Sequence, residues 1–158
     1  MVVPRFSPPV TIGDLVKMAI QFPRSRCRKD LVEQFERAFA GFLECDRVLA
    51  APSARIALQV GLEELKTSDR DEVIVPSFTY AAMPAAIHAA GCRPVFADIT
   101  PDTFHLDARS VESLITPRTL AVIPTHLFGQ PCDLEPILNL AESRRILVIE
   151  DCAQSCGA

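Results

Sequence analysis

The chain has 158 residues, of which 49% are hydrophobic and 23% are charged, and this is enough to build one domain around a sizeable core. Its 16 basic and 20 acidic side chains give a mild formal net charge of −4 and leave no basic footprint. The composition therefore excludes a disordered or fibrous protein, and it gives no support to nucleic acid or an anionic membrane surface as a partner.

An uncharged stretch, residues 73–91, is long enough to raise the question of a membrane span. It contains Pro76 and Pro84 and changes halfway from a β-branched to an alanine-rich pattern, so we expect a strand, a turn and a helix instead. The amino terminus lacks the charged region and apolar core of a secretory signal, which favours the cytoplasm. The six cysteines form no C-x-x-C pair, so we expect reduced thiols and no metal site.

Two amphipathic stretches open the chain, and we expect each to form a helix because apolar residues recur at helical spacing in residues 11–22 and 30–43. After them, short apolar runs alternate with helical patterns. The predicted strands are residues 47–51, 72–75, 94–97, 120–124 and 146–149, and the predicted helices between them are residues 54–66, 81–90, 108–115 and 134–143. This alternation predicts an α/β fold with a parallel sheet covered on both faces.

The loops that follow the predicted strands are the places to search for chemistry, because ligands of open α/β sheets bind beyond the carboxyl ends of the strands. Ser53 is placed to cap the helix that follows it. The free amides of the first turn of that helix, together with Arg55, form either an anion site or an ordinary cap. Tyr80, the only tyrosine, follows the next strand, where it either packs in the core or stacks on a planar ligand.

Two further junctions carry ionisable residues. His126 follows the strand at residues 120–124 and is either a proton-transfer group or a hydrogen-bonded structural residue. Glu150 and Asp151 directly follow the last predicted strand, where two adjacent carboxylates are costly unless a positive or hydrogen-bonding group meets at least one of them. Because successive side chains of a strand point to opposite faces, only one of this pair faces a given pocket.

Six segments, taken in order, resemble the amino-terminal half of the DegT/DnrJ/EryC1/StrS sugar aminotransferase family. They are residues 35–40, 71–80, 94–99, 115–119, 126–131 and 148–154. The resemblance implies the fold of the fold-type I enzymes that depend on pyridoxal phosphate, which is a three-layer α/β/α arrangement with a mostly parallel sheet. It also implies that residues 1–45 form amino-terminal helices and that residues 46–158 form part of the cofactor-binding large domain.

The resemblance implies contacts to the cofactor ring from three residues. Asp151 matches the aspartate that pairs with the pyridine nitrogen and keeps it protonated, so that the ring can accept electrons. Gln154 matches a residue beside the ring, and Tyr80 matches the aromatic side chain that stacks on it. The resemblance gives His126 and Glu150 no chemical role, so we expect them to be structural.

The resemblance also implies that Ser53, Ala54 and Arg55 form the turn that binds the cofactor phosphate. The family usually has a glycine and then a threonine where this chain has Ala54 and Arg55. This difference removes a hydroxyl donor and makes a close backbone approach to the phosphate harder. Arginine binds phosphate through its charge and paired hydrogen bonds, so we expect the turn to keep its role with altered geometry.

Family members carry a lysine, downstream of the aspartate, that binds the cofactor covalently and then moves the proton. The three lysines of this chain are Lys17, Lys29 and Lys66, and none matches that position. We therefore expect the sequence to be an incomplete part of an aminotransferase, inactive on its own, without the remaining strands, the catalytic lysine and the small carboxy-terminal domain.

By resemblance, the complete enzyme transfers an amino group from an amino acid, with glutamate as the expected donor, to a keto group of a nucleotide-linked sugar for polysaccharide or other glycan synthesis. We expect a cytoplasmic homodimer. One alternative is a dehydratase of the same family, in which a histidine replaces the lysine. Another is a non-catalytic half-domain that binds the cofactor or a partner chain. A generic nucleotide-binding domain ranks last, because neither G-x-G-x-x-G nor G-x-x-x-x-G-K-[ST] occurs.

Overall fold

The computed structural model describes residues 11, 13, 16 and 29–157, and the chain forms two compact units, unit 1 (residues 1–50) and unit 2 (residues 51–158). The predicted helix at residues 11–22 lies largely outside the described residues. Among the helices that the structure does describe, none has the length and apolar character needed to cross a membrane.

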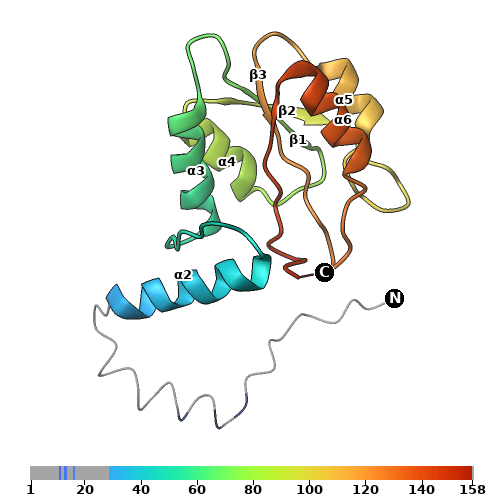
Figure 1. The fold of residues 1–158 in the computed structure, drawn as a ribbon. Helices are drawn as coiled ribbons and strands as arrows, with labels where there is room; N and C mark the ends of the chain where they lie inside the picture. The colour runs from blue at the N-terminus through green and yellow to red at the C-terminus, as the bar shows by residue number, and fades with distance from the viewer. Residues whose placement is uncertain (1–10, 12, 14–15, 17–28, 158) are drawn as a thin grey trace. The chain divides into compact units, whose positions relative to one another are not determined.

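Unit 1 contains helix α2 (Lys29–Leu43), which confirms the helix predicted at residues 30–43 (Figure 1). Its apolar face carries a row of aromatic rings. Phe35 and Phe39 stack with their centroids 5.5 Å apart, and Phe39 and Phe42 stack at 5.9 Å. This row accounts for the helical spacing of phenylalanine in the sequence.

The predicted strand at residues 47–51 is wrong. These residues form no backbone ladder in the structure, and the side chain of Leu49 is 88% exposed. The amide of Ala50 donates instead to the carboxylate Oε1 of Glu36 at 2.8 Å. An apolar run forms a strand only where a neighbouring strand accepts its backbone hydrogen bonds, and here a helix side chain takes one of them.

Unit 2 is built on a four-stranded parallel sheet with the order β2-β1-β3-β4. Its strands are β1 (Glu72–Pro76), β2 (Arg93–Ala97), β3 (Thr119–Val122) and β4 (Leu147–Val148). Its helices are α3 (Ala54–Leu65), α4 (Ala82–Ala89), α5 (Ala108–Leu114) and α6 (Glu135–Arg144). The α/β fold is therefore confirmed, and the boundaries of these eight elements differ from the predicted ones by at most two residues.

Two apolar cores lie on opposite faces of this sheet. Figure 1 shows α3 and α4 on one side of the sheet and α5 and α6 on the other. Val73 and Val75 of the central strand β1 pack with residues of α3 and α4, and Ile74 between them packs with residues of α5 and α6. All five residues of β1 are buried. This is why the central strand reads as a continuous apolar run rather than an alternating one.

The order of the strands defines where a ligand is expected. The chain passes from β1 through α4 to β2 on one side, and then returns through α5 to β3 on the other side of β1. The direction of the winding therefore reverses between β1 and β3. In sheets of this kind ligands bind at the carboxyl edge beside such a switch point, which here is bordered by the loops after β1 and β3.

Glu72 is a buried carboxylate at the amino-terminal end of β1, away from that edge. Thr116 donates a hydrogen bond to its Oε2 at 2.7 Å, Arg93 donates one to its Oε1, and Arg118 lies 3.6 Å away. Burial raises the pKa of Glu72. The hydrogen bonds from Thr116 and Arg93 and the charges of both arginines outweigh burial, and together they hold the pKa below its ordinary value.

We expect acid to weaken unit 2 through this carboxylate. Because the pKa of Glu72 is lower in the folded chain than the ordinary value of 4.5, its stabilising contribution is complete above 4.5 and is lost as the pH falls through the folded value. The free energy of unfolding in urea, measured from neutral to acid pH, should fall less steeply for Glu72→Gln than for wild type. Glu142→Gln, at an exposed position, is the control. If the unfolding free energy of Glu72→Gln depended on pH in the same way as that of wild type, Glu72 would not be the group through which acid weakens unit 2.

Candidate functional site

The backbone ladder between β3 and β4 continues past the ends of both strands. The amide of Asp151 donates to the carbonyl of Pro124 at 2.9 Å, and the amide of His126 donates to the carbonyl of Asp151 at 3.1 Å. Thr125 is the direct partner of Asp151 in this extension. The residues after the two strands therefore keep the side-chain alternation of a sheet.

This alternation places Glu150 and Asp151 on opposite faces, as the sequence predicts. Val148 packs against the core under α5 and α6, whereas Ile149 packs against the core under α3 and α4. Two residues further along, Glu150 shares the face of Val148 and Asp151 shares the face of Ile149. Asp151 is therefore the carboxylate that faces the side of α3 and α4.

The carboxylate of Asp151 is half-buried and only partly used. Its Oδ1 accepts a hydrogen bond from the amide of Ala153 at 3.0 Å, and no described residue donates to its Oδ2. Its ladder partner Thr125 is on the same face and is buried, and the Oγ1 of Thr125 has no hydrogen-bond partner among residues 29–157. The Oδ2 of Asp151 is thus free to accept a hydrogen bond from a ligand.

Gln154 lies in the turns that follow Asp151. Its Oε1 accepts a hydrogen bond from the amide of Phe128 at 3.0 Å. This contact joins the loop after β3 to the segment after β4. It fixes the side-chain oxygen of Gln154 and leaves the two N–H donors of the amide group available.

The amino end of α3 has the features of an anion site. Ser53 accepts a hydrogen bond from the amide of Ile56 at 3.3 Å, which confirms Ser53 as the cap. The amides of Ala54 and Arg55 have no partner in the described part of the chain, and the side chain of Arg55 is exposed and forms no ion pair there. This end of α3 and the segment after β4 lie at the same edge of unit 2 (Figure 1).

Tyr80 lies just before α4, on the same side of the sheet as α3. Its side chain is 75% exposed, so the alternative that it packs in the core is wrong. Its carbonyl accepts a hydrogen bond from the amide of Met83 at 2.9 Å, which fixes the backbone at the start of α4. The ring is therefore available for a planar ligand, and its stacking on one stays a prediction.

Lys66 does not belong to this edge. It follows the carboxyl end of α3, and its Nζ donates a hydrogen bond to the carbonyl of Ala90, just after α4, at 2.6 Å. Helices that connect parallel strands run opposite to them, so both residues lie toward the amino-terminal edge of the sheet. Lys17 and the side chain of Lys29 are outside the described residues.

The ligand atoms of His126, Glu150 and Cys152 lie within 4.8 Å of one another, which raises the question of a metal site. The Nδ1 of His126 accepts a hydrogen bond from the amide of Cys132 at 2.8 Å, so the proton of the neutral ring is on Nε2, 3.0 Å from Glu150. A protonated nitrogen is not a metal ligand. Burial, together with the charge of Glu150, also raises the pKa of the Cys152 thiol. This cluster is therefore a hydrogen-bonded pair beside a thiol.

Sequence reasoning missed that His126 and Glu150 bind each other. They are 24 residues apart, so no local pattern links them. The available signal was their common position, because each lies just beyond the end of one of two neighbouring parallel strands. The hydrogen bonds predicted for His126 are confirmed, and its structural role stays a prediction.

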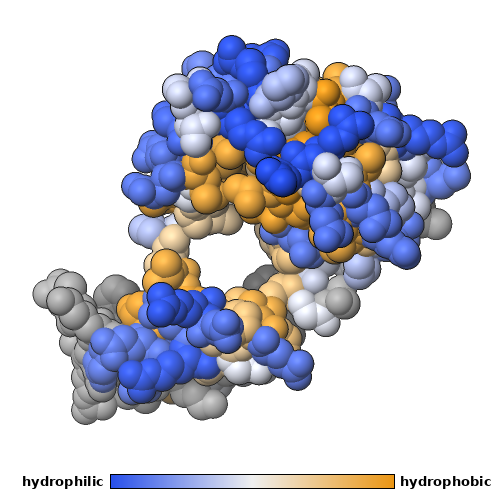
Figure 2. Space-filling model, turned by 45° about the horizontal axis from the view of Figure 1, so that its top comes forward, coloured by the Kyte–Doolittle hydropathy of each residue, from blue (hydrophilic) through white to orange (hydrophobic). Residues whose placement is uncertain are grey.

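The polar surface of unit 2 is interrupted by apolar areas, as Figure 2 shows for one face. Two exposed aromatic side chains also lie in the loops at the carboxyl edge. Phe78 after β1 and Phe104 after β2 are both exposed, and their ring centroids lie 5.5 Å apart. This edge therefore combines exposed rings with one carboxylate oxygen and two amides that have no partner among the described residues, which suits a planar ligand that carries an anionic group.

Comparison with known proteins identifies the family. The family model described as the DegT/DnrJ/EryC1/StrS aminotransferase family matches residues 24–158. The chain is 44% identical over 127 residues to the GDP-perosamine synthase of Caulobacter vibrioides. It is 42% identical over 127 residues to the dTDP-3-amino-3,4,6-trideoxy-alpha-D-glucose transaminase of Streptomyces venezuelae. Each match covers 80% of this chain and 34% of the relative.

A solved structure agrees with these relatives. The crystal structure of NtdA from Bacillus subtilis with bound cofactor PMP matches with a TM-score of 0.82 and 33% sequence identity, over 90% of this chain and 33% of that one. The chain thus spans about a third of the length of the curated relatives that it matches. The family model covers most of the chain, and the sequence identities are well above those that show the fold alone. The chain belongs to the DegT/DnrJ/EryC1/StrS aminotransferase family.

Proposed function

We propose that this chain supplies the ring- and phosphate-binding residues of a pyridoxal-phosphate-dependent aminotransferase that acts on a nucleotide-linked sugar. The observation that carries the proposal is the free Oδ2 of Asp151, on the sheet face covered by α3 and α4. The names of the relatives from Caulobacter and Streptomyces support the substrate class. The PMP bound to the Bacillus protein supports the cofactor class.

The residues present fit such a cofactor. A protonated pyridine nitrogen needs a carboxylate oxygen without another donor, and Asp151 offers one. A phosphate needs several donors, and the unpaired amides of Ala54 and Arg55 at the positive end of a helix provide them, together with the Arg55 guanidinium. The exposed ring of Tyr80 provides a flat apolar surface on the same side of the sheet.

Pyridoxal phosphate, when bound, supplies an electron sink for the carbon that gains or loses the amino group. Asp151 holds the proton on the ring nitrogen, and the Ala153 amide fixes the carboxylate so that Oδ2 keeps its direction. Gln154 is held at its oxygen by Phe128 and presents its N–H donors. Tyr80 shields one side of the ring from water.

We propose that these residues bind and orient the cofactor, and that Lys66 does not bond to it. The Nζ of Lys66 is engaged with Ala90 toward the other edge of the sheet. The rest of the proposal is carried by resemblance: an amino-acid donor, a cytoplasmic homodimer, and a division into amino-terminal helices (residues 1–45) and a cofactor-binding part (residues 46–158).

A second candidate function is a non-catalytic half-domain that binds the cofactor without transferring an amino group. The position of Lys66 favours it, because the described part of the chain offers no lysine at the carboxyl edge. The two candidates share the cofactor site and differ in turnover. Titration of the 158-residue chain with pyridoxamine phosphate tests the shared site, and failure to bind would exclude both.

Arg55→Ala should weaken the binding of pyridoxamine phosphate by about three- to tenfold, the size of one exposed charge-assisted contact. Fluorescence titration of the 158-residue chain measures this. Pyridoxamine, which has no phosphate, should bind wild type and Arg55→Ala equally. Arg109→Ala, an exposed arginine on α5, is the matched control. An equal loss for both ligands, or no loss, would show that Arg55 does not bind the phosphate.

A further inference from the structure

Both ring nitrogens of His126 form hydrogen bonds within unit 2. The side chain is 5% exposed, it accepts from the amide of Cys132 at Nδ1, and its Nε2 lies 3.0 Å from Oε2 of Glu150. Because Nδ1 is an acceptor, Nε2 must donate, and Glu150 must accept. In this pair the Nε2 of His126 is therefore the donor and the Oε2 of Glu150 is the acceptor.

The backbone of His126 binds the same segment as its side chain. Its amide donates to the carbonyl of Asp151 at 3.1 Å, and its carbonyl accepts from the hydroxyl of Ser155 at 3.1 Å. With the contact to Glu150, this single residue binds the segment after β4 on both sides of Asp151. The bond from the Phe128 amide to Gln154 adds a further link between the same two segments.

The segment after β4 needs such support because β4 is short and lies at the end of the strand order. It contains two residues, and β3 is its only neighbour among the described strands. Residues 153–157 are turns rather than a helix or strand. The positions of Asp151 and Gln154 therefore depend on the loop after β3, to which His126 belongs.

We propose that His126 and Glu150 form a positioning pair for the cofactor ring. The pair lies on the sheet face covered by α5 and α6, opposite to the face of Asp151. It acts through Asp151 and Gln154 without touching the ring. This inference rests on the proposed function, because it says that two residues without contact to the ligand fix the orientation of the Asp151 carboxylate. Glu150 is 46% exposed, so its hydrogen bond adds little to global stability and mainly fixes local geometry.

The test compares two substitutions at Glu150 in the 158-residue chain. Glu150→Ala removes the acceptor and should weaken pyridoxamine phosphate binding by about fivefold, the size of one hydrogen bond. Glu150→Gln keeps an oxygen acceptor without the charge and should stay within about twofold of wild type. His126→Phe, which keeps a ring and loses both bonds, should weaken binding at least as much as Glu150→Ala.

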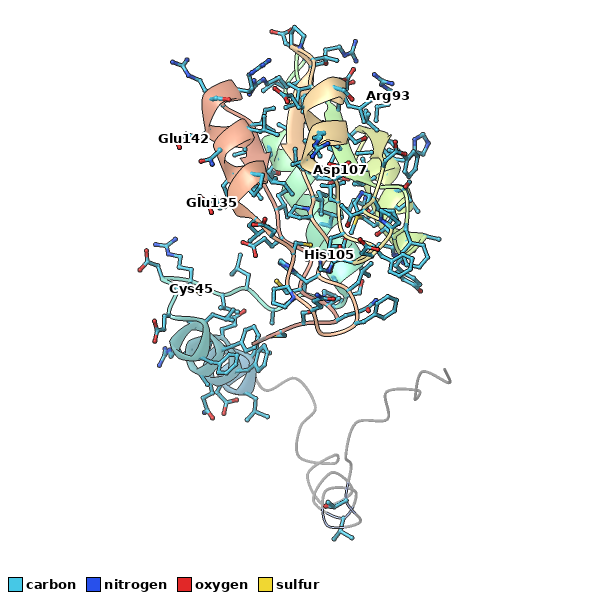
Figure 3. All side chains as sticks on the ribbon, turned by 90° about the vertical axis from the view of Figure 1, so that its right-hand side faces the viewer. Cys45, Arg93, His105, Asp107, Glu135 and Glu142 are labelled. Carbon is cyan, nitrogen blue, oxygen red and sulfur yellow. The ribbon has the colours of Figure 1, made fainter. Side chains whose placement is uncertain are left out.

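A readout without cofactor separates positioning from general stability. In the free chain, amide hydrogen exchange at Ala153 and Phe128 should rise by about fivefold in Glu150→Ala and return toward wild type in Glu150→Gln. Exchange in the central strand β1 should stay unchanged. Glu142→Ala is the matched control, because Glu142 is exposed on α6 and its labelled side chain points away from the sheet in Figure 3.

The outcomes separate this inference from the proposed function. If wild type does not bind pyridoxamine phosphate, the proposed function fails, and the inference fails with it. If wild type binds and Glu150→Ala binds equally well, the positioning role alone is overturned. A loss of exchange protection that is equal throughout unit 2, and that Glu150→Gln does not restore, would also overturn it, because the pair would then be a general structural contact.

Discussion

Replacing Asp151 by alanine is expected to weaken the binding of pyridoxamine phosphate by about ten- to a hundredfold. In the proposed site the ring nitrogen donates a hydrogen bond to the Oδ2 of Asp151, both groups are charged, and such bonds contribute about 1.5–3 kcal/mol. Asp151→Asn keeps the shape and the hydrogen bond from Ala153 but loses the charge, so its affinity should lie between those of wild type and Asp151→Ala. Fluorescence titration of the purified chain measures all three.

The control for this prediction is Asp69→Ala, an exposed aspartate in the loop between α3 and β1. This variant removes the same charge from the loop that precedes β1, away from the carboxyl edge, and it should bind pyridoxamine phosphate like wild type. If Asp69→Ala and Asp151→Ala lose the same affinity, the effect comes from net charge and not from a contact. If neither loses affinity, the ring does not lie against Asp151.

Ile74→Ala is expected to lower the free energy of unfolding of unit 2 by about 2–5 kcal/mol. Ile74 is fully buried in the central strand, where it packs with the core under α5 and α6. Truncation to alanine removes apolar surface that folding transfers from water into the core, and it leaves a cavity between the sheet and two helices. Because single domains of this size are stable by about 5–15 kcal/mol, this loss is a large fraction of the total free energy of unfolding.

Urea unfolding followed by circular dichroism checks this prediction, with Leu138→Ala as the control. Leu138 is an exposed leucine on α6, so the same kind of truncation should change the unfolding free energy by less than about 0.5 kcal/mol. Similar losses for the two variants would mean that the sheet does not have the core described above.

The α/β fold was predictable from the sequence because the central strands are apolar on both faces. Residues 72–75 are a run that suits only a strand buried between two layers, and the helical patterns on either side have the length of crossover connections. The run at residues 47–51 has a similar composition and is not a strand. Composition shows that a segment is suited to a sheet, but it does not show whether a neighbouring strand is there to pair with it.

The candidate site was predictable only in part, for a related reason. Strand alternation indicated that only one of Glu150 and Asp151 can face a given pocket, and the resemblance implied Asp151. The structure adds an independent reason, because Ile149 belongs to the core under α3 and α4. The bond between His126 and Glu150 was not predictable, since it depends on which strands are neighbours in space and on their register.

The chemical shift of the ring nitrogen reports whether Asp151 keeps the bound cofactor ring protonated. Pyridoxamine phosphate labelled with ¹⁵N in the ring would be bound to the 158-residue chain at a pH where the ring of the free compound is unprotonated. We expect the shift of a protonated pyridine in wild type and that of an unprotonated one in Asp151→Asn. An unprotonated shift in wild type, or a protonated shift in both proteins, would contradict this expectation.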